Sequence, residues 1–500
     1  MGMRSVLSQP LATWIVQRQQ EWMNRPVEAQ QRWFRRLVAG GTATQFGADH
    51  RFEAIQSVAD FQQAVPVRDY EDLKPYIEKT VAGQPDMLWP GKPVYFAKTS
   101  GTTSGTKYIP ITADSIPNHI DSARDALLNY IHETGNSAFL DKKLIFLSGS
   151  PELDEKAGIK TGRLSGIANH HVPAYLRTNQ LPSYETNIID DWEAKLDRII
   201  EETIHQPMSL ISGIPPWVQM YFDRIQERTG KPIKDVFPDF SVFVYGGVNF
   251  EPYRARLFDS IGKRIDSIET YPASEGFIAF QDSQTEEGLL LLLDSGIFFE
   301  FIPADDYFDP NPRRLTIGEV ELGKNYAVII NNNAGLWGYS LGDTVKFVSR
   351  TPYRIVVTGR IKHFISAFGE HVIGEEVEKA LHYAMQQHPE TEVVEFTVAP
   401  MVAPVEGLPY HEWLIEFATA PHDASAFTRD LDHRLTELNV YYDDLITGSI
   451  LRPLKLTNLP RGAFQRYMKS QGKLGGQNKV PRLANDRTIA DGLLQTRQTA

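Results

Sequence analysis

The spacing of hydrophobic and polar residues changes along the chain and predicts distinct regions. Over residues 1 to about 90 the apolar positions recur at helical spacing, as Trp33, Phe34, Leu37 and Val38 do in QQRWFRRLVAG. This predicts an α-helical lead-in. From Tyr95 onward, short apolar runs that end in glycine or serine alternate with longer amphipathic stretches. The runs are LIFLSGS at 144, SLISGIPP at 209, SVFVYGGVNF at 241 and RIDSIETYPASEG at 264. Their alternation with helices predicts an α/β sheet.

The pattern of apolar and polar residues changes again from residue 289 onward. LLLLLDSGIFFEFIP, from residue 289, has an Asp294-Ser295-Gly296 turn between two strand-like runs, and TIGEVELGKNYAVIINN continues the β character. After Gly359 the pattern predicts a strand, a helix, two strands and a second helix, in HFISAF, EEVEKALHYAMQ, EVVEFTVAP, EWLIEFA and AFTRDLDHRLTEL. We therefore predict a β-rich subdomain and then a small α+β domain. The predicted domains are 1–358 and 359–500, with a loose polar tail after Arg482.

Composition narrows the function classes. The 500 residues are 42% hydrophobic and 23% charged, which is ordinary globular usage and enough for two or three domains. The formal charge of −12 argues against affinity for nucleic acid or an anionic membrane. The absence of cysteine excludes disulfides, thiolate metal sites and a cysteine nucleophile, and it fits a reducing cytoplasm. The apolar stretch at residues 11–16 is too short for a signal peptide or a membrane span.

The strongest chemical signal is TSGTTSGTK, at residues 99–107, which follows an apolar segment and ends on Lys107. Glycines let backbone amides approach an anion, hydroxyls add short donors, and the lysine brings a positive charge, so the segment suits a polyphosphate. A flexible Ser/Thr/Gly linker is the alternative, but linkers rarely lie between apolar strands and end on a lysine. The segment is not a Walker loop, because Thr106 and Tyr108 stand where that pattern needs a glycine and a serine or threonine.

Other familiar catalytic patterns are incomplete. HEWLI at 411 has Ile415 where a zincin needs its second histidine, and PASEG at 272 lacks the first glycine of a nucleophile elbow. Local packing or hydrogen bonding explains the adjacent His170 and His171 better than a metal does, because neighbouring histidines do not easily face one ion.

Five segments resemble the motifs of the acyl-adenylate-forming superfamily, in the same order. TSGTTSGTK resembles TSGTTGxPK, with Ser104 and Thr106 as departures. YPASE at 271, GEVELG at 318 and YSLGD at 339 resemble Y-G-x-T-E, G-E-L-x-x-x-G and Y-x-T-G-D, and GRIKHFISAFGEHVIGEEVE at 359 resembles the hinge signature. Within the superfamily, AKTSGTTSGTKYIP, GKNYAVIINNNAGLWGYSLGDTVKF and QNKVPR are similar to the Gretchen Hagen three (auxin-responsive promoter) family of acyl acid amido synthetases, in a bacterial-type form. This resemblance spans nearly the whole chain.

The resemblance implies a fold and a reaction. The implied fold is α/β, with a large N-terminal α/β domain that includes a β-barrel subdomain, and a small, mobile C-terminal α+β domain. The implied reaction joins a carboxylic acid to an amino acid through an acyl-AMP intermediate, with ATP and Mg²⁺. The expected partners are therefore small molecules, without nucleic acid or membrane, and we predict a cytoplasmic monomer.

The same resemblance implies roles for individual residues. Lys107 and Lys479 are the implied catalytic lysines: Lys107 holds the terminal phosphates, and Lys479 brings charge between the carboxylate and the α-phosphate. Glu275 matches the glutamate that holds Mg²⁺, and Asp343 the aspartate that binds the ribose hydroxyls. Tyr271 offers a ring face to the adenine. The other implied nucleotide-binding residues are Ser100, Gly101, Thr102, Thr103, Ser104, Gly105, Gly246, Gly247, Val248, Ser274 and the hinge residue Arg360.

Several alternatives stay open. Without the neighbouring motifs, Glu275 could equally be an exposed loop carboxylate, and Asp343 could be a turn residue. Lys479 taken alone would be a solvated lysine of the tail. His371 stands where plant members of the family have a lysine, so the second half-reaction is less defined than the first. The chain could instead be an acyl-CoA synthetase that accepts the CoA thiol, or a nucleotide-binding protein that has lost catalysis. The sequence identifies neither the acid nor the amino acid.

Overall fold

The structure, a computed structural model, describes residues 2–100, 106–172, 177–189, 191–247, 250–361, 364–365, 372–402, 404–447, 450–472, 480–484 and 486–498. The chain forms two compact units. The first contains Met1–Phe250 and Leu257–Val357, and the second contains Glu251–Arg256 and Thr358–Ala500. Among the helices described, none is long and apolar enough to cross a membrane.

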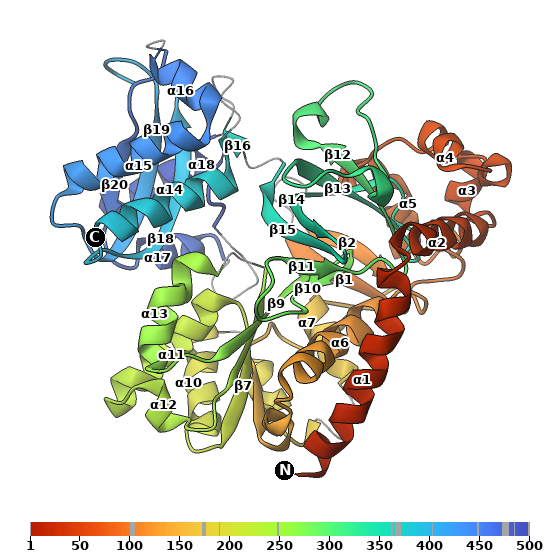
Figure 1. Cartoon of the computed structure of the whole chain (residues 1–500), viewed down its shortest axis with the longest axis horizontal. Coiled ribbons are helices and arrows are strands. Elements are labelled where there is room, and N and C mark those ends of the chain that lie inside the picture. Colours follow the sequence, from red (N-terminus) through yellow and green to blue (C-terminus); the bar gives the residue numbers. More distant parts are fainter. Residues whose placement is uncertain are drawn as a thin grey trace. The chain divides into compact units, whose positions relative to one another are not determined.

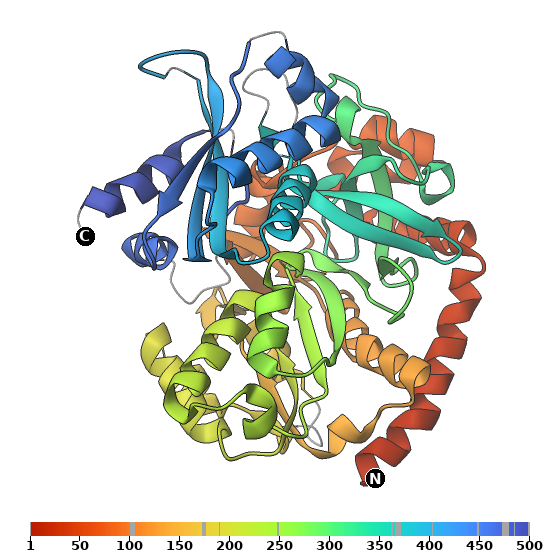
Figure 2. The same cartoon turned by 60° about the vertical axis from the view of Figure 1, so that its left-hand side comes forward.

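The first unit opens with α-helices, as the helical spacing predicted (Figure 1). They are α1 (Met3–Met23), α2 (Pro26–Gly41), α3 (Gln45–Asp49), α4 (Val58–Ala64) and α5 (Tyr70–Val81), with the short 3₁₀ helix η1 (Phe52–Ala54) among them. Helices α4 and α5 begin at capping boxes, in which Ser57 and Asp69 accept backbone N–H bonds. Of the predicted face of α2, Phe34, Leu37 and Val38 are buried and Trp33 is partly buried. Helix α1 lies along α6 (Ile116–Thr134), as Figures 1 and 2 show.

A sheet of eleven described strands forms the core of the first unit, in the order β12-β13-β14-β15-β11-β10-β9-β8-β7-β3-β6. Strands β6, β3, β7, β8 and β9 are parallel neighbours, whereas β9, β10, β11 and β15 are antiparallel, as are β12, β13 and β14. The strand bounds are β3 (Lys143–Phe146), β6 (Gln180–Leu181), β7 (Met208–Ser212), β8 (Val242–Gly246), β9 (Asp266–Ala273), β10 (Gly276–Phe280), β11 (Leu289–Leu291), β12 (Ile297–Pro303), β13 (Asn325–Asn332), β14 (Tyr339–Arg350) and β15 (Tyr353–Arg360). Four of the parallel strands coincide with the four predicted apolar runs, which confirms the α/β prediction.

A second, smaller sheet and further helices complete the first unit. The sheet has the order β2-β1-β5-β4, with β1 (Tyr95–Ser100), β2 (Thr106–Ile111), β4 (Asp154–Lys156) and β5 (Ile159–Gly162). The helices are α7 (Leu164–His170), α9 (Tyr184–Asn187), α10 (Trp192–Thr203), α11 (Pro215–Thr229) and α12 (Ile233–Val236), with 3₁₀ turns η2 (Ala138–Asp141), η3 (Ala304–Asp306) and η4 (Ile317–Glu319). Helix α13 (Glu251–Ile261) is divided, because its residues up to Arg256 belong to the second unit. Helices α10 to α13 gather beside β7 in Figure 1.

The β-rich stretch after β10 pairs differently from the simplest interpretation of its sequence. Strands β11 and β12 flank the predicted Asp294-Ser295-Gly296 turn, but they do not pair with each other. Strand β11 pairs with β10 and β15, and β12 pairs with β13. The strands expected in the β-barrel subdomain thus continue the sheet of the α/β strands.

The second unit is a small α+β domain, as predicted. Its sheet has the order β18-β19-β20, and β16 pairs with β17. The bounds are β16 (Phe364–Ile365), β17 (Val372–Ile373), α14 (Gly374–Gln387), β18 (Glu392–Met401), β19 (Tyr410–Thr419), α15 (Ala424–Leu438), α16 (Val440–Thr447), β20 (Lys455–Leu459), α17 (Ala463–Ser470) and α18 (Thr488–Gln498). The helix expected over EEVEKALHYAMQ is α14, with Val377, Ala380, Leu381, Ala384 and Met385 expected on one face. The first four are buried, and Met385 is partly buried against the same core.

The segment after Arg482 is not a loose polar tail, so this expectation was wrong. It contains helix α18, which packs on α17 and buries Ala490 and Leu493 in one cluster with Tyr467. At Gly492 a Cβ would lie only 2.4 Å from the Tyr467 ring, so the contact is close. The sequence concealed this helix because its few apolar residues make a face only together with α17.

Candidate functional site

The carboxyl ends of the parallel strands β8 and β9 carry four of the predicted site residues. Strand β8 ends at Gly246 and is followed by Gly247, whose φ of +77° favours glycine. Strand β9 is followed by Ser274 and Glu275, which form the turn into β10. Because the two strands are parallel neighbours, their ends lie at the same edge of the sheet. In open α/β sheets this edge is where ligands bind.

Close packing between β8 and β9 explains the glycine at position 246. A Cβ on Gly246 would lie 2.3 Å from the carbonyl oxygen of Thr270 and 2.7 Å from its hydroxyl oxygen. Thr270 is itself fixed, because its hydroxyl donates a hydrogen bond to the carbonyl of Tyr245 at 2.9 Å. The edge therefore presents bare backbone at Gly246, against which a flat ring can lie.

Two tyrosines and two carboxylates form crossed pairs at this edge. The Tyr271 hydroxyl of β9 donates to Oδ2 of Asp343 on β14 at 2.6 Å. The Tyr339 hydroxyl, also on β14, donates to Oε1 of Glu275 at 3.2 Å. In each motif the tyrosine precedes the carboxylate by four residues, and each tyrosine bonds the carboxylate of the other motif. Both rings are buried, with 8% and 3% of the Tyr271 and Tyr339 surfaces exposed.

These bonds also show how the sheet is shaped. Strands β15, β11 and β10 lie between β14 and β9 in the sheet order, yet side chains of β14 and β9 are in contact. The sheet must therefore curve strongly, so that β14 faces the end of β9. A third contact fixes the same corner: the Asn332 side-chain amide, at the end of β13, donates to the backbone carbonyl of Glu275 at 2.7 Å.

The structure describes the two flanks of the predicted phosphate-binding loop. Strands β1 and β2 form an antiparallel pair in which Thr99 faces Lys107 and Ser100 faces Thr106. The Lys107 ammonium lies 5.2 Å from the centre of the Tyr70 ring, where the ring face attracts a cation. Burial raises the pKa of the Tyr70 phenol, so this ring stays neutral. Gly101, Thr102, Thr103, Ser104 and Gly105 lie outside the described residues.

The remaining predicted residues are distributed over the two units. Arg360 ends β15 and belongs to the second unit. Val248, His371 and Lys479 lie outside the described residues. The structure thus brings together Gly246, Gly247, Tyr271, Ser274, Glu275 and Asp343 at one edge of the main sheet, with Ser100 and Lys107 on the hairpin of β1 and β2.

The segment that follows Lys479 is firmly anchored, which the sequence did not predict. The Val398 amide of β18 donates to the carbonyl of Arg482 at 2.9 Å, and the Thr397 hydroxyl donates to the carbonyl of Pro481 at 2.7 Å. The Arg482 guanidinium forms ion pairs with Glu395 and, at 3.5 Å, with Glu378. Tyr339 and Asn332 were missed in the same way. Tyr339 lies in the YSLGD motif, but the hydrogen-bond partners of both residues are distant in sequence, so no local pattern predicts these contacts.

Glu275 is the candidate metal ligand. Nowhere in the described ranges do three or more His, Cys, Asp or Glu side chains gather so that they could hold a metal by themselves. A single carboxylate such as Glu275 suits Mg²⁺, which is commonly held by one or two carboxylates together with substrate phosphates. Oε1 of Glu275 accepts a hydrogen bond from the Tyr339 hydroxyl, which orients the carboxylate.

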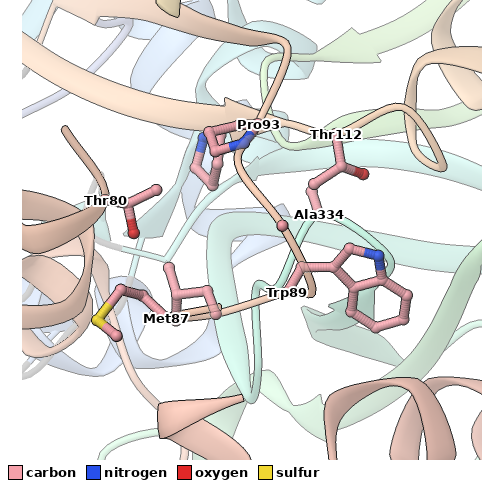
Figure 3. A pocket seen from close by; sticks show the side chains of 9 residues that line it. Thr80, Met87, Trp89, Pro93, Thr112 and Ala334 are labelled. Carbon is pink, nitrogen blue, oxygen red and sulfur yellow. The ribbon is translucent and has the colours of Figure 1, made fainter. Parts of the chain in front are cut away.

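A small hollow lies apart from these residues, between α5, β2 and the turn that follows β13 (Figure 3). About 220 Å³ of space without atoms lies there, part of it open to solvent. Its lining residues are Thr80, Met87, Leu88, Trp89, Gly91, Pro93, Pro110, Thr112 and Ala334. None of these nine residues belongs to the predicted site.

The chain matches three domains of one protein family. Residues 15–180 match the GH3 family N-terminal domain, residues 290–360 the GH3 family central domain, and residues 375–488 the GH3 family C-terminal domain. Together these matches span more than half of the chain, and they follow the order of the regions described above.

Individual relatives agree with the domain matches. The jasmonoyl-L-amino acid synthetase GH3.5 of Oryza sativa subsp. japonica is 24% identical over 530 residues, covering 88% of each chain. The solved structure of the acyl acid amido synthetase AtGH3.15 with 2,4-DB has a TM-score of 0.79 at 15% identity, covering 97% of this chain and 96% of that one. A 2-hydroxyisobutyryl-CoA ligase in its postadenylation state has a TM-score of 0.61 at 14% identity, covering 95% and 93%. These likenesses bear out the expected fold.

Proposed function

The chain belongs to the GH3 family, and from that premise we propose that it is an ATP-dependent ligase that joins a carboxylic acid to an amino acid. The observation that carries the proposal is the pair of crossed bonds, Tyr271 to Asp343 and Tyr339 to Glu275. These bonds hold Asp343, the implied ligand of the ribose, and Glu275, the implied ligand of Mg²⁺, at the carboxyl edge of the sheet. Nucleotides bind at this edge in such folds. The relatives' names, as amido synthetases, support an amine as the acceptor.

In the first half-reaction, the acid's carboxylate attacks the α-phosphorus of ATP, and pyrophosphate leaves with the electron pair of the broken bond. Asp343 would hold the ribose hydroxyls, and the Tyr271 bond would keep the carboxylate oriented toward them. Lys107 and the residues from Ser100 to Gly105 would hold the terminal phosphates. Glu275 would hold Mg²⁺, which neutralises charge on the phosphates. Lys479 would stabilise the charge that develops between the acid and the α-phosphate.

In the second half-reaction, the amine of the amino acid attacks the acyl carbon, and AMP leaves. The amine must lose a proton to become an amide, and His371 is a candidate acceptor by its position in the sequence. We further propose that the enzyme is a cytoplasmic monomer that uses small-molecule substrates. The absence of cysteine and the charge of −12 support this proposal.

A pyrophosphate-release screen tests the proposed function. Carboxylic acids are crossed with the standard amino acids and with CoA, because the fold also occurs in a CoA ligase. We expect ATP-dependent pyrophosphate release with at least one acid, and formation of an amide when an amino acid is added. Thioester formation with CoA and no amide would instead identify an acyl-CoA synthetase. Absence of pyrophosphate with every acid would indicate a nucleotide-binding protein without catalysis.

A further inference from the structure

Arg163 is a half-buried arginine without a counter-ion. In the part of the chain that the structure describes, its guanidinium makes neither a hydrogen bond nor an ion pair. Other arginines of the first unit that are similarly buried do have carboxylate partners, such as Arg314 with Glu300 and Arg354 with Asp282. Burial alone lowers the pKa of the Arg163 guanidinium, because no opposite charge offsets the lost hydration.

A second unpartnered polar group lies beside Arg163. The hydroxyl of Ser165 is buried and has no hydrogen-bond partner among the residues described. Both side chains lie against Gly149: a Cβ there would be 2.8 Å from Cδ of Arg163, 3.4 Å from Oγ of Ser165 and 3.7 Å from Nε of Arg163. A buried polar group without a partner is rare, so the Ser165 hydroxyl, next to an arginine without a counter-ion, calls for an explanation. The absence of a side chain at position 149 lets the Arg163 and Ser165 side chains lie close to the backbone of this turn.

The surroundings of Gly149 are rigid. The Ser148 carbonyl accepts a hydrogen bond from the buried ammonium of Lys195 at 3.1 Å, which fixes the start of this turn. At Gly166 a Cβ would lie 2.4 Å from the carbonyl oxygen of Ser150, so α7 packs tightly on the same turn. The two donors at Arg163 and Ser165 are therefore held by packed backbone on both sides.

The position in the fold places these donors beside the proposed reaction. Gly149 follows β3, which is a parallel member of the main sheet and ends at the same edge as β7 and β8. Arg163 follows β5, which pairs in parallel with β1 so that Gly162 faces Ala97. Strand β1 continues to Ser100 and the predicted phosphate loop. Arg163 thus lies between the carboxyl edge of the sheet and the strand that leads to the phosphates.

We propose that Arg163 and Ser165 form a carboxylate-binding subsite for one of the two substrates. A guanidinium N–H and a neighbouring hydroxyl supply two donors for the two oxygens of a carboxylate, with the positive charge that a carboxylate needs. A phosphate fits less well, because Lys107 lies on β2 and therefore flanks β1 on the side opposite to β5. Both the acid and the amino acid carry a carboxylate, so the shared chemistry has two sources. This inference rests on the proposed ligase function.

Arg163→Gln and Arg163→Lys test the subsite, with Arg198→Gln as a matched control on an exposed arginine of α10. The KM values for the acid, the amino acid and MgATP are measured for each variant with the substrates that the screen identifies. Arg163→Gln should raise the KM of one carboxylate substrate about tenfold to a hundredfold, the usual effect of losing a charged donor. Arg163→Lys should fall between it and wild type, and the control should match wild type.

The two sources separate in single-turnover measurements of pyrophosphate release without amino acid. A raised requirement for the acid there assigns the subsite to the acid. A defect that appears only in amide formation, and that disappears when the amino acid is replaced by its carboxamide, assigns it to the amino acid. A rise in the KM of MgATP alone, or no change in any KM, would overturn the carboxylate subsite.

Failure of the subsite and failure of the ligase function can be told apart by binding. If wild type releases no pyrophosphate with any acid, the ligase function fails, and the subsite is then judged by calorimetric titration with benzoate as the probe and benzamide as its uncharged control. Tighter binding of benzoate to wild type than to Arg163→Gln, with benzamide unaffected, supports the subsite. Equal affinities, or no benzoate binding to wild type, overturn it.

Discussion

Lys107 on β2 is paired in register with Thr99 on β1, beside the predicted phosphate-binding loop, and its ammonium lies near the Tyr70 ring. We expect Lys107 to contact only the triphosphate of ATP. Lys107→Ala should therefore lower kcat/KM for ATP while the KM for the acid stays unchanged. Loss of one charged donor predicts a decrease of roughly tenfold to a hundredfold. Initial rates of pyrophosphate release against ATP concentration measure this. Lys160→Ala, on the exposed side of β5, is the control, and a Lys107→Ala enzyme with wild-type kinetics would remove this loop from the site.

The Tyr339 hydroxyl directs the carboxylate of Glu275, which predicts a specific Mg²⁺ phenotype. Glu275→Gln should raise the Mg²⁺ concentration needed for half-maximal activity sharply, because it removes the anionic ligand. Tyr339→Phe should raise it in the same direction but less, since the ligand remains and only its orientation is lost. Mg²⁺ titrations of adenylate formation at saturating ATP measure both effects.

The control for Tyr339 is Tyr326→Phe. Tyr326 is also buried in the main sheet, and its hydroxyl accepts from the Glu321 amide, away from Glu275. An unchanged Mg²⁺ titration in Glu275→Gln would exclude Glu275 as a metal ligand. Equal shifts in Tyr339→Phe and Tyr326→Phe would show that the effect is general destabilisation rather than positioning.

His119 on α6 should make stability depend on pH. It is 6% exposed, its Nδ1 has no partner among the residues described, and burial lowers its pKa from 6.5 to about 4. The unfolded chain binds a proton below about pH 6.5 that the folded chain binds only below about pH 4. Stability should therefore fall as the pH is lowered from about 7 to about 4, by at most about 3 kcal/mol from this group. Urea unfolding at several pH values should show a shallower dependence in His119→Gln, and an identical dependence would contradict this assignment.

At the residue scale, the sequence motifs supply candidates for the site whose roles stay predictions. Glu275 and Asp343 were identified by their neighbours, and the structure brings both to one edge. Their hydrogen-bond partners were not predicted, because Tyr271 and Asp343 are 72 positions apart and meet only after the sheet curves. Arg163 was overlooked for a similar reason, since what distinguishes it is a missing partner, which only packing reveals.

At the scale of an element, the contact between β8 and β9 depends on the absence of a side chain at Gly246. Gly246→Ala would place a methyl group 2.3 Å from the Thr270 carbonyl, so the strands must separate. We expect a loss of about 1–3 kcal/mol in the free energy of unfolding, as for other overpacked sites, together with weaker ATP binding. Urea unfolding and calorimetric titration with ATP measure the two effects.

Gly374→Ala is the control for Gly246→Ala. A Cβ there meets nothing closer than 3.7 Å, and the residue begins helix α14, so alanine fits. Its stability and ATP binding should match wild type. If Gly246→Ala behaves like Gly374→Ala, the close approach of β8 and β9 does not constrain the site.

The elements themselves show what a sequence pattern can and cannot supply. The runs at 144, 209, 241 and 264 became β3, β7, β8 and β9. Strands β7 and β8 are buried along most of their length, as continuous apolar runs predict, whereas most of β9 is half-buried or exposed. Pairing was not predictable for β11 and β12, because their partners come from later or earlier parts of the chain and the turn between them resembles a hairpin. Helix α18 was missed because Leu493 and Ala490 find their partners on α17.

At the scale of the whole molecule, the reaction is proposed to use two domains in sequence. The first unit carries Lys107, Glu275 and Asp343, whereas Arg360 and Lys479 belong to the second. Pro481 and Arg482, which follow Lys479 in the sequence, are held to β18 by their backbone carbonyls and by the Arg482 ion pairs. A charge carried on a separate domain can serve one half-reaction and be withdrawn for the other.

Lys479→Ala therefore tests the alternation. Acyl-AMP formation should fall by roughly a hundred- to thousand-fold, the usual effect of losing one group that stabilises the transition-state charge. Chemically supplied acyl-AMP should still react with the amino acid at the wild-type rate, because that step breaks the bond to AMP without needing Lys479. Lys379→Ala, an exposed lysine on α14 that pairs with Glu375, is the control in the same unit. Rapid-quench measurements of each half-reaction decide the outcome. If Lys479→Ala slows both steps equally, a single arrangement of the domains must serve both steps, and Lys479 is not specific to acyl-AMP formation.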